Sequence, residues 1–419
     1  MRSTQALLPG ATFDPQELLS PHQAIAAYFA AFAVGPVGLQ RVALADAAGR
    51  VLAADAVATE SVPADLRSTM DGFAVRSADG TAPRRIAGEV RMGHAPPGAL
   101  GAGQAMAIPT GGVLPAGADA VVPIEDATIA GDMLTVHAAP EAHAFYTPPA
   151  SDVRAGECVI PAGRRLGGPE LGVLATLGFA EVEVFRQPCV AIVSTGDELV
   201  DVDARLGVGQ VRDSNRWAIA GALAATGADV VHLKRATDDR DVLRARIAEG
   251  LERADAVILT GGSSVGERDL TPDVIESFDG PGVIVHGLRV KPGKPTVLAA
   301  IGTKPVIGLP GNPTSALTIL EAVCAPVISR LTGEREHRAN TIACVAGEAF
   351  VGRAGWTWYV PAELRPAPVG ERAYPLPLRS AHTSLLARAH GYVVLTEDCS
   401  RIEAGEPLTV VRFSGGGRA

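Results

Sequence analysis

Lysine is scarce in this chain of 419 residues: only four of its 37 basic residues are lysines, and the others are arginines. Two of the four, Lys291 and Lys294, flank a Pro-Gly pair in the segment KPGKP (291–295). Lysine carries a compact point charge, whereas arginine presents a rigid planar fork. A pair of lysines in a chain that otherwise uses arginine therefore indicates a local binding role, with two solvated lysines in a surface turn as the alternative.

A positive charge excess and an aromatic-rich composition are also missing. The formal net charge is −9, no block of like charges occurs, and only 4% of the residues are aromatic. We therefore expect no nucleic-acid partner and no anionic membrane surface, and any anion site must be local.

Disulfide, zinc and targeting signals are absent from the pattern. The five cysteines are odd in number and none has CxxC spacing. The N-terminal stretch lacks a basic region followed by an apolar one, and there is no uninterrupted apolar run of about 20 residues. These features predict reduced thiols in a soluble, cytoplasmic protein with no membrane partner. We expect Cys158 to be buried and inert, with a reactive thiol as the alternative.

Common phosphate-loop and nucleophile motifs are missing as well. Five residues separate Gly287 from Gly293 where a Walker A loop has four, and Pro295 replaces its Ser or Thr. No GxGxxG follows a predicted strand, and no Ser-His-Asp or Cys-His arrangement is evident. A P-loop enzyme is excluded, and nothing favours a dinucleotide-binding protein or a triad hydrolase.

The apolar pattern that is present changes along the chain. Ser20 and Pro21 open an Ala-rich helix over 21–33, and a second helix is expected over 168–177. Between about 50 and 150, short apolar runs alternate with Gly and Pro turns, which predicts a small β lobe inserted into a helical region.

Apolar strands alternate with helices beyond Pro188. The runs CVAIVS (189–194), ADAVILT (254–260) and VIVHGLRV (283–290) are each predicted to be one strand. Such alternation is typical of a doubly wound, mostly parallel sheet covered by helices on both faces. After about residue 337 short strands return, which predicts a small β-barrel or, alternatively, a sandwich.

The sequence therefore predicts an α/β multidomain fold. Its four parts are a helical linker domain (15–50 and 149–187), an inserted β lobe (51–148), an α/β domain (188–333) and a C-terminal β-barrel (337–415).

Acidic residues follow the strands of the predicted sheet. In doubly wound folds, ligands bind outside the carboxyl ends of the strands. STGDEL (194–199) contains Asp197 and Glu198, TDD (237–239) follows the next strand, and GGSSVGERD (261–269) ends in Asp269. Taken singly, Asp238 or Asp239 could be a helix N-cap and Asp197 a turn residue. Together they indicate an acidic rim.

Anion-binding features follow the same strands. Gly261 and Gly262, with Ser263, form a turn whose backbone N–H groups could hold an oxyanion. In PGNPTS (310–315), Asn312 is expected to cap a helix that opens toward the rim, with ordinary capping as the alternative reading. Carboxylates beside ammonium groups indicate Mg²⁺-assisted chemistry on a phosphorylated ligand.

These segments, in this order and spacing, resemble the molybdenum insertases (molybdopterin molybdenumtransferases), the family that includes the gephyrin E domain. The match covers roughly residues 15 to 415. The matching segments are STGDEL (194–199), GGSSVGERD (261–269), KPGKP (291–295) and LPGNPTS (309–315), with RSTMDGFAVR (67–76) and PTGGVLPAGADAVVPIED (109–126) in the N-terminal half.

The resemblance implies an elongated homodimer that inserts molybdate into adenylylated molybdopterin, with Mg²⁺-dependent release of AMP. It also implies a cleft shared between the α/β domain of one subunit and the β lobe of its partner. The residues carried over are Asp71 and Thr110 from the lobe, and Glu198, Asp238, Asp269, Ser263, Lys291, Lys294 and Pro310 from the α/β domain. Without the resemblance, Asp71 and Thr110 would be interpreted as capping or turn residues.

Our hypothesis assigns roles to these groups. Lys291, Lys294 and the turn at 261–264 hold the phosphates, and three carboxylates, Glu198, Asp238 and Asp269, bind Mg²⁺. A molybdoenzyme or an adenylyltransferase is a possible protein partner.

Two departures keep other functions open. The family usually has a segment ending in Gly-Glu-Asp, but here it is DVRAGEC (152–158) and ends in Cys158. The family's Met-Thr-Gly-Ala is PTGG (109–112), although Thr110 is retained. A paralogue, a non-enzymatic gephyrin-like scaffold, or a molybdopterin adenylyltransferase are the alternatives, and the sequence does not distinguish molybdate from tungstate.

Overall fold

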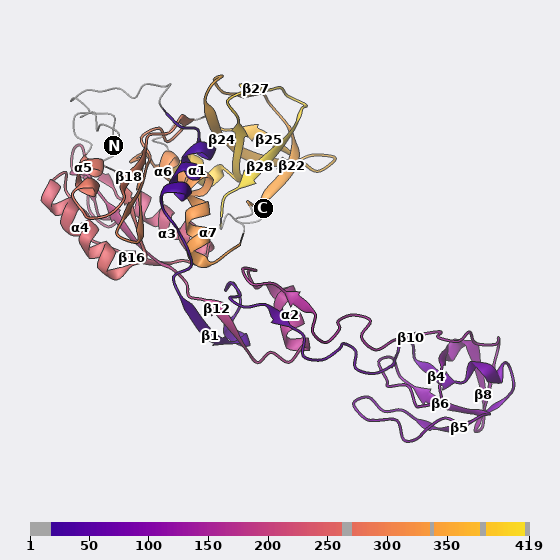
Figure 1. Ribbon diagram of the computed structural model, residues 1–419. Coiled ribbons are helices and arrows are strands. Elements are labelled where there is room, and N and C mark those ends of the chain that lie inside the picture. The colour runs from indigo at the N-terminus through magenta and orange to yellow at the C-terminus, as the bar shows by residue number, and fades with distance from the viewer. Residues whose placement is uncertain (1–17, 262–269, 336–338, 378–382, 415–419) are drawn as a thin grey trace.

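The computed structural model describes residues 18–261, 270–335, 339–377 and 383–414. Figure 1 shows an elongated chain with three regions. The α/β domain and the C-terminal barrel pack together at one end, a small domain lies in the middle, and the β lobe lies at the far end.

A six-stranded sheet forms the centre of the α/β domain. Its order is β16 (Asp229–His232), β13 (Cys189–Ser194), β17 (Ala256–Thr260), β21 (Lys304–Leu309), β20 (Val297–Ile301) and β18 (Gly282–His286). The first three pairings are parallel and the last two antiparallel. Two residues join β20 to β21, which is too short for a crossover helix, so this pair must be antiparallel. The mostly parallel, doubly wound sheet predicted from the sequence is confirmed.

Helices cover both faces of this sheet. The helices are α3 (Asn215–Ala225), α4 (Arg240–Arg253), α5 (Leu270–Glu276), α6 (Pro313–Ile319) and α7 (Ala325–Thr332). Val190 and Ile192 pack with residues of α3, α6 and α7, whereas Ala191 and Val193 pack with residues of α4 and α5. Successive side chains of β13 point to opposite faces of the sheet and therefore contribute to two separate apolar cores.

Helix α1 (Pro21–Ala31) packs against the α/β domain. Ser20 and Gln23 form the capping box that begins it. Tyr28 is fully buried and its hydroxyl donates to the Ala299 carbonyl at 3.0 Å. Residues 21–31, which the sequence had grouped with the linker domain, thus share a core with the α/β domain.

The prediction of one strand over 283–290 is wrong. Strand β18 ends at His286, and Gly287 follows with a φ of +84°, a left-handed conformation that ends an extended run. The next strand, β19 (Val290–Lys291), pairs in parallel with β24 (Thr357–Pro366) of the C-terminal domain. The segment KPGKP therefore lies where two domains meet.

The C-terminal domain is a closed barrel. The barrel strands are β24, β25 (Glu371–Pro375), β22 (Thr341–Ala346), β28 (Pro407–Arg412) and β26 (Gly391–Leu395). Pairing of β24 with β26 closes the circle, which confirms the barrel and excludes the sandwich. Smaller elements of this domain are β23 (Phe350–Val351), β27 (Arg401–Ile402) and α8 (Thr383–Arg388).

The middle domain combines one helix with paired strands. Strand β1 (Leu39–Ala43) pairs with β12 (Glu181–Phe185), and β2 (Ala56–Val57) pairs with β11 (Cys158–Ile160) beside α2 (Gly168–Thr176). Cys158, the first residue of β11, is exposed. The expectation that this thiol is buried is therefore wrong, because β11 pairs along only one edge, in a two-stranded sheet.

The β lobe is built on one six-stranded sheet. The strands run in the order β7 (Ala120–Pro123), β4 (Gly72–Val75), β6 (Gln104–Ile108), β5 (Arg84–Glu89), β9 (Met133–Val136) and β8 (Ala127–Ala130). A short pair, β3 (Arg67–Ser68) with β10 (Tyr146–Thr147), leads into and out of it.

A long helical run crosses the core of the α/β domain. It consists of α6, a π-helical turn (Leu320–Cys324) and α7. Among the described residues, this run alone is long and apolar enough to cross a membrane by composition, but 72% of its apolar window is buried inside the fold. It is a core helix here.

Glu321, on the π-helical turn, links this helix to the end of the barrel. Its carboxylate accepts hydrogen bonds from the Ser414 N–H at 3.1 Å and the Ser414 hydroxyl at 2.7 Å. Burial raises the pKa of Glu321, and the Ser414 hydrogen bonds offset only part of this effect.

We predict that Glu321→Gln stabilises the protein at neutral pH. Folding raises the pKa of Glu321 above its ordinary value of 4.5, so ionising this carboxyl group lowers the free energy of unfolding at higher pH. Below the unfolded-state pKa the group is protonated in both states, and this destabilisation is absent. The free energy of unfolding of Glu321→Gln should therefore exceed that of the wild type at pH 7 and match it at pH 4. Denaturant titrations at both pH values measure this, and an equal effect at both would contradict it.

Candidate functional site

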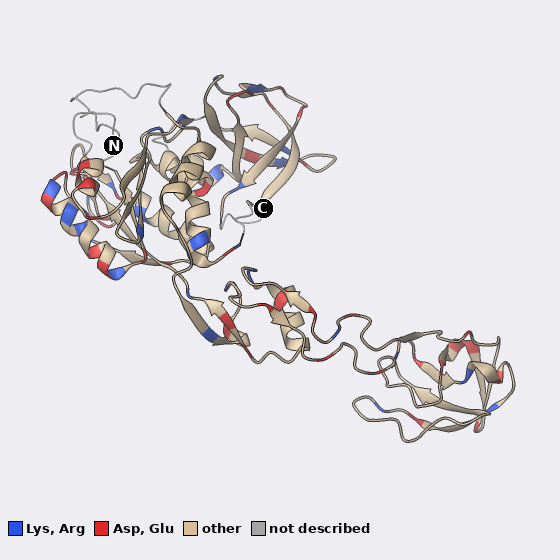
Figure 2. Cartoon of the chain, in the orientation of Figure 1, with Lys and Arg blue, Asp and Glu red and all other residues tan. Residues whose placement is uncertain are grey.

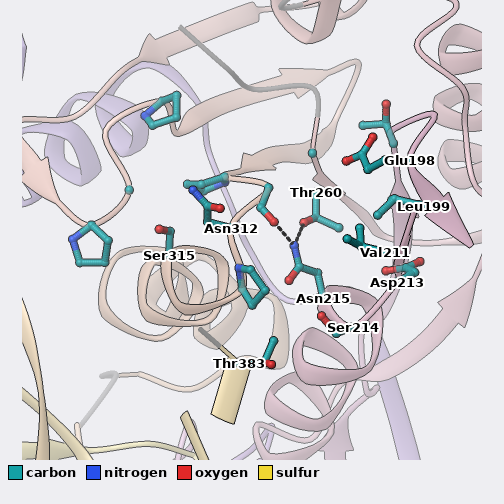
Figure 3. A pocket seen from close by; sticks show the side chains of 18 of the residues that line it. Glu198, Leu199, Val211, Asp213, Ser214, Asn215, Thr260, Asn312, Ser315 and Thr383 are labelled. Carbon is teal, nitrogen blue, oxygen red and sulfur yellow. Dashed lines mark hydrogen bonds between the residues drawn. The ribbon is translucent and has the colours of Figure 1, made fainter. Parts of the chain in front are cut away.

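A cavity of about 960 Å³ opens at the carboxyl ends of the central strands. Thr195 follows β13, Gly261 follows β17 and Pro310 follows β21, and all three line it. Residues 291–295, hereafter the lysine turn, form another part of its wall. Figure 3 shows Glu198, Thr260 and Asn312 among the side chains around this cavity. The ligand position predicted from the strand order is where this cavity lies.

Most of the predicted site residues in the α/β domain line the cavity. These are Glu198, Gly261, Lys291, Lys294, Pro310 and Asn312. Asp238 does not line it but is bonded to Thr195, which does. Gly262, Ser263 and Asp269 lie outside the described residues, so their roles stay predictions.

Gly261 occupies a position that only glycine fits. Its φ is +93°, and a Cβ atom there would lie 2.1 Å from the Thr195 carbonyl oxygen. The loops after β13 and β17 therefore approach each other to backbone contact, which leaves the Gly261 backbone at the cavity wall.

The lysine turn packs closely against the helix that forms the cavity floor. Gly293 has a φ of +108°, and a Cβ atom there would lie 2.1 Å from Ile319 Cγ1 on α6. Lys291 is exposed, and its Nζ lies 4.7 Å from the ring centroid of Trp358. Lys294 is half-buried. The turn thus places two lysines at one cavity.

Among the acidic residues of the rim, Asp239 caps a helix, whereas Glu198 and Asp238 have exposed carboxylates that do not cap a helix. Asp239 caps α4, since its Oδ1 accepts from the N–H groups of Asp241 and Val242 at 2.9 Å. Asp238 instead accepts from the Thr195 hydroxyl at 3.3 Å, and its own N–H donates to Asp197 Oδ1 at 3.1 Å. The capping alternative therefore holds for Asp239 and not for Asp238. Glu198 and Asp238 are both exposed.

Glu198 and Asp238 fit a hard cation such as Mg²⁺ in their donor chemistry, because both are exposed carboxylates near Thr195. Within the described residues, no group of three or more His, Cys, Asp or Glu side chains is arranged to hold a metal ion. The third predicted ligand, Asp269, lies outside those residues. Magnesium binding therefore stays a prediction.

Asn215 is a site residue that the sequence reasoning missed. Its Nδ2 donates to Thr260 Oγ1 at 2.8 Å and to the Gly311 carbonyl at 2.7 Å, and this joins the ends of β17 and β21 (Figure 3). Among the residues that the structure describes, Asn215 Oδ1 is buried without a hydrogen-bond partner. The Gly311 carbonyl fixes the amide orientation, because a flipped amide would place two acceptors together. The polar run RDSN (212–215) before a buried helix is the available signal in the sequence.

Other missed groups surround Asn215. Asp213 lines the cavity, is 1% exposed and lies 3.1 Å from Arg216 Nε. Ser315, from α6, is buried against the cavity, and Thr383 reaches it from the C-terminal domain. Non-local packing brings these residues together, so spacing along the chain could not indicate them.

The two predicted lobe residues lie together but far from the cavity of their own chain. The Thr110 N–H donates to Asp71 Oδ1 at 2.7 Å. The β lobe and the α/β domain occupy opposite ends of the elongated chain (Figure 1). A cleft that combines these residues with the cavity would need a second copy of the chain.

Charge is mixed along helix α4 of the α/β domain. Acidic and basic side chains alternate along α4, whose sequence is RDVLRARIAEGLER (Figure 2). The paired lysines at the cavity are therefore a local feature and not part of a general basic face.

The fold and this cavity define a multidomain α/β protein with a polar, lysine-bearing site at the rim of a doubly wound sheet. Residues 19–178 match the family model described as the MoeA N-terminal region (domain I and II), and residues 191–330 match the probable molybdopterin binding domain.

Known proteins resemble nearly the whole chain. The Haemophilus influenzae molybdopterin molybdenumtransferase is 30% identical over 392 residues, which cover 90% of this chain and 95% of that protein. The Nostoc protein of the same name is 34% identical over 68% of this chain and 67% of that protein. A crystal structure of a molybdopterin biosynthesis MoeA protein from Pyrococcus horikoshii is 31% identical, with a TM-score of 0.78 and coverage of 95% of this chain and 100% of that one.

The chain therefore belongs to the molybdopterin molybdenumtransferase family, a family of transferases in molybdenum cofactor biosynthesis. The family and the fold class predicted from the sequence are confirmed.

We predict that Gly261→Ala disturbs both the fold and the cavity. The added methyl group must displace the Thr195 carbonyl or the end of β17, which should lower the free energy of unfolding by about 2 kcal/mol. Gly221→Ala is the matched control, because it lies within α3 with open space around it and should be neutral or stabilising by up to about 1 kcal/mol. Thermal unfolding compares the two, and equal stabilities would contradict the close approach.

Proposed function

We propose that this chain inserts molybdate into adenylylated molybdopterin, with Mg²⁺-dependent release of AMP. The single observation that supports this most is that Lys291, Lys294 and Glu198 line one cavity from separate loops. A phosphorylated substrate needs cations for its phosphates, and a divalent metal needs carboxylates beside them.

Lys291 and Lys294 bind the phosphates of the substrate in this proposal. They are point charges on flexible stems and can approach non-bridging oxygens from different directions. Asn312 precedes α6 and lines the cavity, and its side chain makes no capping hydrogen bond to this helix. In this proposal its amide binds the substrate. Ser315, which also lines the cavity, adds a hydroxyl.

Glu198 and Asp238, with Asp269, would hold Mg²⁺. When bound, the metal supplies positive charge to the phosphate oxygens of the phosphoanhydride. Thr195 keeps Asp238 oriented through its hydroxyl, and Asp197 accepts from the Asp238 N–H. These contacts orient the Asp238 carboxylate, and Glu198 lines the cavity from the loop after β13.

The chain needs no nucleophile of its own for this reaction. An oxygen of water or of molybdate displaces AMP from the phosphoanhydride, and molybdenum is bound by the two dithiolene sulfurs of the substrate. The protein orients the reactants and stabilises the charge that develops on the phosphate oxygens. The proposal includes a homodimer, because Asp71 and Thr110 lie at the far end of the chain from its own cavity and would complete the cavity of a second chain. A cytoplasmic location is part of the same proposal.

Cys158 favours a second candidate, a gephyrin-like scaffold with reduced or no activity. It replaces the carboxylate expected from the family pattern, and its thiol is exposed on β11 in the middle domain. A molybdopterin adenylyltransferase is less favoured, because that family usually consists of the α/β domain alone.

We predict that Asp269→Ala and Glu198→Gln each reduce AMP release by at least about 100-fold while the fold stays intact, because each removes a proposed metal ligand. Purified protein is supplied with adenylylated molybdopterin, molybdate and Mg²⁺, and AMP and active cofactor are followed with and without EDTA. Asp203→Asn is the control, since Asp203 is exposed on the neighbouring loop and does not line the cavity. Absence of AMP from the wild type would favour the scaffold, and full activity of Asp269→Ala would contradict the metal assignment.

We predict complementation between Glu198→Gln and Asp71→Asn when the two variants are co-expressed. If each cleft combines one chain's cavity with the partner's lobe, a mixed dimer contains one intact cleft and one doubly altered cleft. Random pairing then restores about a quarter of wild-type AMP release, although each variant alone is inactive. No recovery in mixed dimers, separated by two different affinity tags, would place Asp71 outside the cleft.

A further inference from the structure

The lysine turn belongs structurally to two domains. Strand β19 leaves the α/β domain and adds to the barrel sheet, with Val290 opposite Thr357 and Lys291 opposite Trp358. The Thr357 N–H also donates to the Arg289 carbonyl at 3.2 Å. The backbone of Lys291 is therefore held by the barrel, although the next residues line the cavity.

A side-chain ion pair strengthens this junction. Arg289 Nη2 lies 3.0 Å from Glu397 Oε2, and both side chains are about three-quarters buried, with 25% and 30% exposure. Glu397 follows barrel strand β26, so the segment that leads into the lysine turn is fixed on the barrel by backbone and side chain together.

The Trp358 ring sets the position of the Lys291 side chain. The ammonium nitrogen lies 4.7 Å from the ring centroid, within the range of a cation–π contact, and Trp presents the most favourable aromatic face for it. Trp358 itself is partly buried against the barrel core. A Cβ atom on Gly352 would lie 3.1 Å from Trp358 Cγ, so the ring is closely packed from that side.

We propose, on the basis of the proposed function, that Trp358 is a positioning residue for the phosphate-binding end of the cavity. The ring holds the Lys291 ammonium where a phosphate oxygen of the substrate meets it, and the barrel thereby completes the anion site of the α/β domain. An unanchored lysine side chain would lose more rotamer freedom on binding the same anion.

The scarcity of lysine makes this contact directly observable. Lysine-selective ¹³C labelling of the full-length protein gives signals from only four ε-methylene groups, Lys234, Lys291, Lys294 and Lys304. Lys→Arg variants assign them. A ring current above Trp358 should shift the Lys291 signal upfield of the other three, and Trp358→Leu should remove this shift. A Lys291 signal at the position of exposed Lys234 in the wild type would overturn the proposal.

Ligand binding tests the functional part. AMP, the proposed product, is titrated into the wild type and variants while the lysine signals are followed. Trp358→Leu should weaken AMP binding roughly two- to fivefold, and Trp358→Phe, which keeps an aromatic face, should recover most of the affinity. Tyr374→Leu is the matched control, because it removes a barrel cation–π contact, with Arg365 at 4.3 Å, away from the cavity.

The outcomes separate this inference from the proposed function. Unchanged AMP affinity in Trp358→Leu, or an equal loss in Tyr374→Leu, would overturn the positioning role. If AMP shifts none of the lysine signals of the wild type, the proposed ligand is wrong, and the positioning role is overturned with it. An upfield Lys291 signal would establish the Trp358 contact in either case. Lys304 serves as an internal reference, because its Nζ is bonded to backbone carbonyls of Leu251 and Ala254.

Discussion

The register of three parallel strands determines where everything else in the site can lie. Ser194 pairs with Thr260, and Thr260 pairs with Leu309, so the loops after β13, β17 and β21 begin at one level. Asn215 then joins two of these ends through its amide. A slip of one residue would move the side chains of a strand from one apolar core to the other. Packing in the two cores therefore fixes the register of the strands, and with it the level at which the loops of the site begin.

The sequence indicated this rim well because the relevant signals are local. Gly261, Glu198 and the lysine turn each follow a strand, and strand order alone predicts that such loops converge. The features that the sequence did not indicate depend largely on contacts that no local pattern encodes. The strand predicted over 283–290 is broken at Gly287, and its last residues join a barrel that begins some fifty residues later. Asp239 and Asp238 are neighbours with different roles, and only the hydrogen bonds distinguish the cap from the available carboxylate.

The elongated shape divides the predicted site residues between two ends of the chain. In the lobe, Asp71 accepts a hydrogen bond from the Thr110 N–H. The α/β domain contains the two lysines of the lysine turn and Glu198. The family pattern predicts that the two ends meet across two copies of the chain. The middle domain, with its short paired strands, sets the separation between them (Figure 1).

The π-helical turn at Leu320–Cys324 constrains how this chain can change length. One additional residue in a helix rotates everything beyond it by about 100°. Before the turn, Ser315 faces the cavity, and after it Val327 and Ile328 are buried in the core shared with α1. Deleting one residue there would restore regular helical hydrogen bonding yet turn one of these faces away from its partner. Natural variants should therefore tolerate substitutions in this turn far better than single-codon deletions.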